Sequence, residues 1–163
     1  MTVVIVSFLV AFVVAAYLTW TAGRVERLHD RCAAARASLD AQLVRRAAAA
    51  AALARDHAEV LGERAHLLRG AAQAALDAGE DGRELAENDL TRELRHVPWS
   101  GTEPVLADVV TASSRTTLAR HIYNDAVRDT LALRRRRLPR ALRLGAKHPW
   151  PRYFDIDDGA FPR

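Results

Sequence analysis

The stretch TVVIVSFLVAFVVAAYLTWTA, residues 2–22, decides the fold because it is long, apolar and free of charge. As a helix rising about 1.5 Å per residue it spans roughly 30 Å, which matches the hydrocarbon core of a bilayer. A secretory signal peptide would instead carry a positively charged region before a shorter apolar centre. We therefore predict a single transmembrane helix, with residues 1–23 as the anchor.

The residues at the end of the apolar stretch predict its orientation. Two aromatic side chains, which favour the membrane interface, are followed directly by three arginines, and cytoplasmic flanks are enriched in Lys and Arg. These flanking residues are Tyr17, Trp20, Arg24, Arg27 and Arg31. We predict a single-pass protein of the cell membrane whose N-terminus lies outside and whose remaining residues face the cytoplasm.

The composition of the chain indicates an all-α protein. Hydrophobic residues make up 50% of the 163 residues but aromatic residues only 6%, because alanine supplies much of the apolar count. Alanine has the highest helix propensity and little bulk, so the composition favours closely packed helices. The single cysteine, Cys32, excludes an intramolecular disulfide framework and is compatible with the reducing cytoplasm.

A long amphipathic helix is predicted to leave the membrane with little or no linker and to continue to about residue 78. Apolar residues recur at alternating steps of three and four, which places them on one face of a helix. The first members of this stripe are Val25, Leu28, Cys32, Ala35 and Leu39, and the apolar face continues with Leu43, Leu53, Val60, Leu61, Leu67, Leu68 and Leu76. Gly62 and Gly70 are the two places where this helix could break, and the sequence AGEDG at residues 78–82 is a credible stop.

Two further helices are predicted, at residues 83–97 and from about Pro104 to Arg137, where Pro139 would end the second of them. The second carries a seam of mostly small residues in steps of four and three: Val105, Val109, Ala112, Thr116, Ala119, Tyr123, Ala126, Thr130 and Leu133. Ile122, Val127 and Leu131 are expected to broaden this seam into a face suited to a bundle. We predict an antiparallel helical bundle or long helical hairpin over residues 24–138, followed by a loose basic tail containing prolines and aromatic residues at 139–163.

The sequence ARHIYNDAV, residues 119–127, together with LP at 138–139 and YF at 153–154, resembles the C-terminal signature of the LemA family. The upstream Leu39, Gln42, Leu43, Arg45 and Arg46 are similar to that family's first cytoplasmic helix. The resemblance implies a bacterial, single-pass membrane protein with an antiparallel helical domain. The motif residues it singles out are Arg120, Tyr123, Asn124, Ala126 and Val127.

The motif itself admits two interpretations. Tyr123 is expected to be buried with its hydroxyl satisfied, while Arg120 and Asn124, one helical turn apart, fix how the helices meet. The alternative is a binding role for the same side chains. No nucleophile paired with a base is found near them.

Enzymatic activity is not expected from this sequence, and neither is a cofactor or a metal. The histidines show no metal-ligand spacing, and no glycine-rich phosphate loop is found. These histidines are His29, His57, His66, His96, His121 and His148. The DIDDG sequence at residues 155–159 hints at a calcium loop but is not followed by the bidentate glutamate that such a loop requires.

Positive charge is concentrated at residues 134–152, which hold eight basic residues and no acid. Cations at a helix C-terminus interact favourably with the last carbonyls, but this effect accounts for only some of the eight basic residues. Nucleic-acid binding is disfavoured because the chain shows no recognition helix or aromatic platform. If the chain turns back toward the bilayer, anionic lipid head groups would attract these residues. The candidate lipid contacts are Arg134, Arg135, Arg136, Arg137, Arg140, Arg143 and Lys147.

These patterns favour a membrane-anchored helical scaffold or adaptor of LemA type that serves a protein partner. The alternative is a structural single-pass subunit of a larger membrane complex, similar to the stator stalk of a rotary ATP synthase. Such a stalk should stay helical nearly to its end. The helix-breaking residues Pro98, Gly101, Pro104 and Pro139 argue against it.

Overall fold

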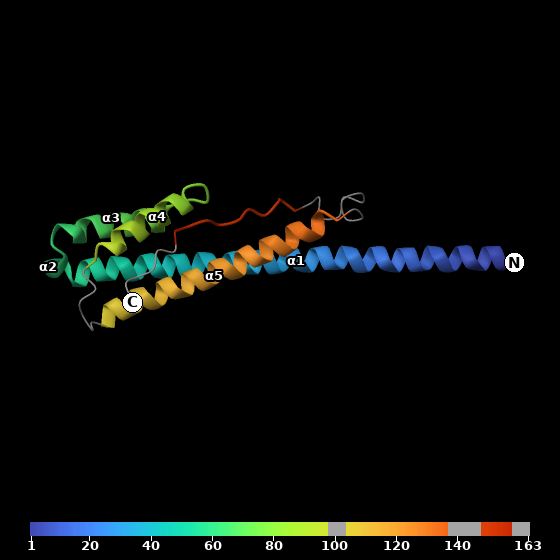
Figure 1. The fold of residues 1–163 in the computed structure, drawn as a ribbon, viewed down its shortest axis with the longest axis horizontal. Helices are drawn as coiled ribbons and strands as arrows, with labels where there is room; N and C mark the ends of the chain where they lie inside the picture. The colour runs from blue at the N-terminus through green and yellow to red at the C-terminus, as the bar shows by residue number, and fades with distance from the viewer. Residues whose placement is uncertain (98–103, 137–147, 158–163) are drawn as a thin grey trace. The chain divides into compact units, whose positions relative to one another are not determined.

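A computed structural model describes residues 1–97, 104–136 and 148–157 of the chain. Within these residues the protein is all-helical, as predicted, and no strand is found. Figure 1 shows the five helices: α1 (Thr2–Asp56), α2 (Ala58–Leu61), α3 (Glu63–Asp77), α4 (Arg83–Arg95) and α5 (Pro104–Arg134). The helices predicted at residues 83–97 and 104–137 correspond to α4 and α5.

The chain divides into two compact units. Unit 1 comprises Met1–Ala34 and Asn124–Arg152, and unit 2 comprises Ala35–Tyr123 and Tyr153–Arg163. Both α1 and α5 therefore contribute residues to each unit. The predicted boundary between residues 138 and 139 lies outside the described residues.

Helix α1 continues without interruption from the apolar stretch to Asp56, so the predicted absence of a linker is confirmed. Its apolar part is the one segment of the described chain that is long and apolar enough to cross a membrane, judged by length and composition. None of the most apolar stretch is buried within the protein. A core helix of a water-soluble protein would bury this surface.

The expectation of one helix to residue 78 is wrong, because the chain breaks at His57 and again at Gly62. Gly62 has φ 57° and ψ −131°, a backbone conformation that favours glycine, and its N–H donates to the Ala58 carbonyl at 2.9 Å. Gly70, the other candidate break, lies inside α3. Helix α3 ends at Asp77, directly before the predicted AGEDG stop.

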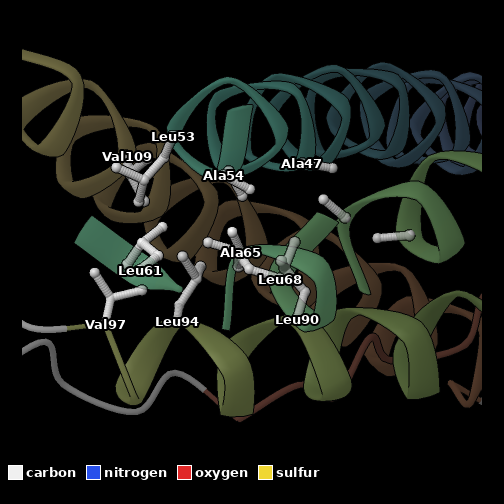
Figure 2. Close-up of a cluster of buried hydrophobic side chains, with 13 residues drawn as sticks. Ala47, Leu53, Ala54, Leu61, Ala65, Leu68, Leu90, Leu94, Val97 and Val109 are labelled. Carbon is white, nitrogen blue, oxygen red and sulfur yellow. The ribbon is translucent and has the colours of Figure 1, made fainter. Parts of the chain in front are cut away.

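The hydrophobic core of unit 2 is formed by α1, α2, α3, α4 and the first part of α5. Helices α3 and α4 pack against each other, and Figure 2 shows Leu68 of α3 lying with Leu90 of α4, and Leu53 of α1 beside Val109 of α5. Leu39 and Leu43 are also fully buried. Each fully buried leucine contributes about 1.5–3 kcal/mol relative to an exposed one.

The predicted apolar face after residue 53 is only partly right. Leu61 and Leu68 are buried as expected, but Val60 and Leu67 are 73% and 58% exposed. After the break at Gly62 the inward positions follow steps of four and three from Leu61, namely Ala65, Leu68, Ala72 and Ala75.

The predicted seam of α5 is largely confirmed. Its fully or nearly buried members are Val109, Thr116, Ala119 and Tyr123 in unit 2, and Ala126, Thr130 and Leu133 in unit 1. Val127 joins them, but Ile122 is 50% exposed and does not broaden the face. The side chain of Val105 lies outside the described residues.

Two seam threonines connect α5 to α1 through their hydroxyl groups. In unit 2, Thr116 Oγ1 donates to the Gln42 carbonyl at 3.2 Å and to Ala112 of its own helix at 3.0 Å. In unit 1, Thr130 Oγ1 donates to the Leu28 carbonyl at 3.4 Å and to Ala126 at 2.8 Å. Each hydroxyl therefore remains satisfied although the side chain is buried.

Candidate functional site

A buried polar cluster lies in the core of unit 2. The Arg46 guanidinium of α1 lies 3.5 Å from Glu87 Oε2 of α4 and donates a hydrogen bond to Thr91 Oγ1, one turn further along the same helix. Thr91 in turn donates to the Glu87 carbonyl at 2.8 Å. The Arg46 and Glu87 side chains are 5% and 0% exposed, so this is an ion pair removed from solvent.

The burial of Glu87 changes its titration. Loss of solvent raises the pKa of the Glu87 carboxyl from 4.5 to about 7, although Arg46 and Arg83 oppose the shift. Because the folded pKa lies above the unfolded value, the stability contributed by the protonated carboxyl is present below pH 4.5. It is lost as the pH rises from 4.5 through about 7.

The residues of the ARHIYNDAV motif occupy two environments. Tyr123 is 5% exposed, and its hydroxyl accepts a hydrogen bond from Arg36 of α1. Arg120 and Asn124 are half-buried. Ala126 and Val127 are buried in unit 1. This placement fits the structural interpretation of the tyrosine, whose ring and hydroxyl are both accommodated.

Arg36 lies between two aromatic rings. Its Cζ atom is 5.6 Å from the centroid of Tyr123 and 5.4 Å from that of Phe154. Burial disfavours the charged guanidinium, but Asp40, 3.4 Å away, and the Tyr123 hydroxyl outweigh this effect and raise the pKa of Arg36. Arg36 therefore remains charged and holds both rings by cation–π contact.

A second polar cluster lies in unit 1, at the end of α5. Arg134 Nη1 donates to the carbonyls of His148 and Pro149, at 3.2 Å and 3.0 Å, and its guanidinium lies 4.1 Å from the Trp150 ring centroid. Through these contacts Arg134 holds residues 148–150 against the helix.

The ring of His148 connects this cluster to α1. It stacks on His29 with centroids 4.4 Å apart, and its Nε2 lies 3.2 Å from Glu26 Oε2. Burial, His148 and Arg134 lower the pKa of His29, against the smaller opposing effects of Glu26 and Asp30. Because the folded pKa lies below the unfolded value of 6.5, the stability contributed by neutral His29 is present above pH 6.5 and is lost as the pH falls below it.

The candidate lipid-contact residues divide into three groups. Arg134 is 7% exposed and bound to backbone carbonyls, so its guanidinium is not available to a head group. Arg135 and Arg136 are exposed at the end of α5. Four further candidates lie outside the described residues: Arg137, Arg140, Arg143 and Lys147.

Among residues 1–97, 104–136 and 148–157, no group of three or more His, Cys, Asp and Glu side chains could hold a metal ion. Cys32 is buried. The polar side chains described above form one cluster in each of the two units.

Sequence reasoning missed Glu87 and the His29–His148 pair. Glu87 could have been found, because it shares the helical face of Leu90 and Leu94 and so falls at a core position. The pairing of His29 with His148 depends on chain segments more than a hundred residues apart and leaves no local pattern.

No protein-family model, curated protein or solved structure matches this chain. The fold and the exposed apolar segment define an all-helical protein with one candidate membrane span. The resemblance to the LemA family stays a prediction.

Proposed function

We propose that this chain is a membrane-anchored helical scaffold or adaptor of LemA type, with its helical domain in the cytoplasm beneath the cell membrane. One observation carries the proposal. A single helix, α1, begins with an apolar stretch that none of the described residues buries and continues into residues that pack in a core. An apolar stretch of this kind is stable in a bilayer, and the remainder of α1 is stable only when other helices cover it.

The contacts within unit 2 support an antiparallel course of α5 along α1. Val109 belongs to the core that contains Leu53, Thr116 binds the carbonyl of Gln42, and Tyr123 lies against Arg36. As the residue numbers rise along α5, the numbers of the residues that they contact on α1 therefore fall. In unit 1, Thr130 of α5 likewise binds a carbonyl of α1, that of Leu28.

The contacts within unit 1 support a lipid role for the exposed arginines. Arg134 binds the carbonyl of His148, and His148 binds Glu26, which follows the apolar stretch by only a few residues. The end of α5 is therefore tied to the part of α1 that leaves the proposed span. Arg135 and Arg136 would then meet anionic head groups, each contributing about 1 kcal/mol near the surface.

The stalk alternative is less well supported. An extended stalk needs a helix that continues outward, whereas α1 ends at Asp56 and is followed by breaks at His57 and Gly62. The contacts of α5 with α1 also require the chain to turn back. A scaffold explains these turns because they create a folded surface for a partner.

Spin labels on the exposed residues Ala41 and Leu118 test the reversal of the chain. We expect Ala41→Cys and Leu118→Cys, in a Cys32→Ala background, to give an electron–electron distance on the order of 20–30 Å. This distance is the sum of the separation between two packed helix axes, about 8–10 Å, and the lengths of the two spin-label side chains. An uninterrupted helix between the same residues would give roughly 100 Å or more. A distance in that long range would contradict the scaffold and support the stalk.

Vesicle flotation of residues 24–163, which lack the apolar stretch, tests the lipid contact. We expect binding to vesicles containing phosphatidylserine and little binding to neutral vesicles. Arg135→Ala with Arg136→Ala should weaken that binding about tenfold or more, since two head-group contacts are lost. The matched control removes two exposed arginines of unit 2, Arg45→Ala with Arg64→Ala, and should change little. Equal binding to neutral and anionic vesicles would exclude the lipid contact.

A further inference from the structure

The segment Tyr153–Asp157 is extended and alternates between buried and exposed side chains. Phe154 and Ile156 are 2% and 5% exposed, whereas Tyr153, Asp155 and Asp157 are exposed. The expectation of a loose tail is therefore wrong for these five residues. A period of two is typical of an extended chain that lays one face on a surface.

Helix α4 binds the backbone of this segment through two side chains. The N–H of Asp155 donates to Glu84 Oε1 at 2.8 Å, and the N–H of Asp157 donates to Asn88 Oδ1 at 2.7 Å. Alternate residues of an extended chain lie about 6.6 Å apart, and residues one turn apart on a helix rise about 6 Å. The spacing of the two acceptor oxygens therefore matches the spacing of alternate N–H groups in an extended chain. Every residue except proline has such a backbone N–H group.

Selectivity comes from the side chains. Phe154 lies 5.4 Å from the Arg36 guanidinium, and Asp157 lies 2.7 Å from Arg95, while Ile156 is buried. The surface thus accepts an aromatic residue, an aliphatic residue two positions later and an acid directly after it. Backbone hydrogen bonds combined with sites for alternate side chains are a recurring mode of peptide recognition.

We propose that this surface of unit 2, formed by Arg36, Glu84, Asn88 and Arg95, is a docking site for an extended acidic segment of a partner protein. The segment has the pattern aromatic, any residue, aliphatic, acid, and the chain's own residues 153–157 occupy the site until the partner displaces them. The inference rests on the proposed adaptor function and names the kind of partner it serves.

Displacement requires a partner segment to replace the contacts that residues 153–157 make. The segment buries two large side chains and makes two backbone hydrogen bonds, and its ion pair with Arg95 joins side chains that are 42% and 57% exposed. Exposed ion pairs contribute only about 0–1 kcal/mol. A partner segment with the same chemistry forms the same contacts, so it competes mainly against the high effective concentration of a tethered segment.

The test uses the full chain in lipid nanodiscs and a fluorescent peptide of residues 151–157, PRYFDID. Phe154→Ala with Ile156→Ala opens the site without altering any residue that forms it. We expect this opened variant to bind the peptide at least tenfold more tightly than the wild type, because the wild-type site is occupied by its own segment. Circular dichroism of the opened variant confirms that it is still folded.

Charge reversal tests the assignment of the site. Arg95→Glu in the opened variant should weaken peptide binding at least tenfold, and a peptide carrying Asp157→Lys should restore it. Glu84→Gln keeps an acceptor oxygen and should bind like its parent, whereas Asn88→Ala should bind more weakly. Equal binding to wild type and opened variant, no binding to the folded opened variant, or no effect of Arg95→Glu would each overturn the proposal. The two proposals can fail separately. If the spin labels on Ala41 and Leu118 showed no chain reversal but the peptide still bound, the docking site would stand and the scaffold function would be rejected.

Discussion

Replacing Arg46 with alanine is expected to lower the free energy of unfolding by about 3–5 kcal/mol at pH 8, because the substitution leaves a buried carboxylate without its partner. Glu87 is 0% exposed and its pKa is about 7, so at pH 8 it is mostly ionised in the folded protein. Chemical unfolding of the full chain in detergent micelles, followed by circular dichroism, measures the loss.

The loss should shrink at pH 5, where Glu87 is protonated with or without Arg46. What remains is the hydrogen bond from Arg46 to Thr91, about 1.5–3 kcal/mol for a charged donor. The control replaces both partners by apolar side chains of similar size, Arg46→Met with Glu87→Leu, and should be at least as stable as the wild type to within about 1 kcal/mol. A double variant as unstable as Arg46→Ala would contradict the ion-pair explanation.

Leu90→Ala is expected to destabilise the protein by about 2–5 kcal/mol, since it removes a fully buried side chain and leaves a cavity between α3 and α4. Leu85 offers a matched control on the same helix. It is 68% exposed, so Leu85→Ala should change the free energy of unfolding by no more than about 0.5 kcal/mol. The same unfolding measurement serves both variants, and equal effects would show that α4 does not pack as described.

The helices and the seam of α5 could be predicted from the sequence because local rules determine them. Pro104 begins α5, AGEDG follows the end of α3, and a repeat of four and three places Val109, Thr116 and Tyr123 on one face. Helix periodicity acts within a few residues, so it is visible without any knowledge of the neighbouring chain.

The inward face after residue 56 was only partly predictable, because alanine fills many of its buried positions while larger apolar residues lie outside it. Val60 and Leu67 are apolar but exposed, whereas Ala65, Ala72 and Ala75 are buried. A glycine indicates that a break is permitted, and it does not indicate by how much the next helix is rotated.

The extended segment could not be predicted, because tertiary contacts alone order it. Residues 153–157 contain no helix, and both backbone hydrogen bonds that fix them come from α4 side chains about 70 residues earlier. Glu84 and Asn88 resemble ordinary surface residues in the sequence. Only the folded chain shows that they accept the N–H groups of an extended segment.

The opposite pKa shifts of His29 and Glu87 mean that a fall in pH acts in opposite directions on the two units of the molecule. Below pH 6.5, charging of His29 works against the contacts that hold His148 and its neighbours, while the packing around Glu87 gains stability. Just below pH 6.5, a rise in pH therefore strengthens the contribution of neutral His29 and weakens that of protonated Glu87.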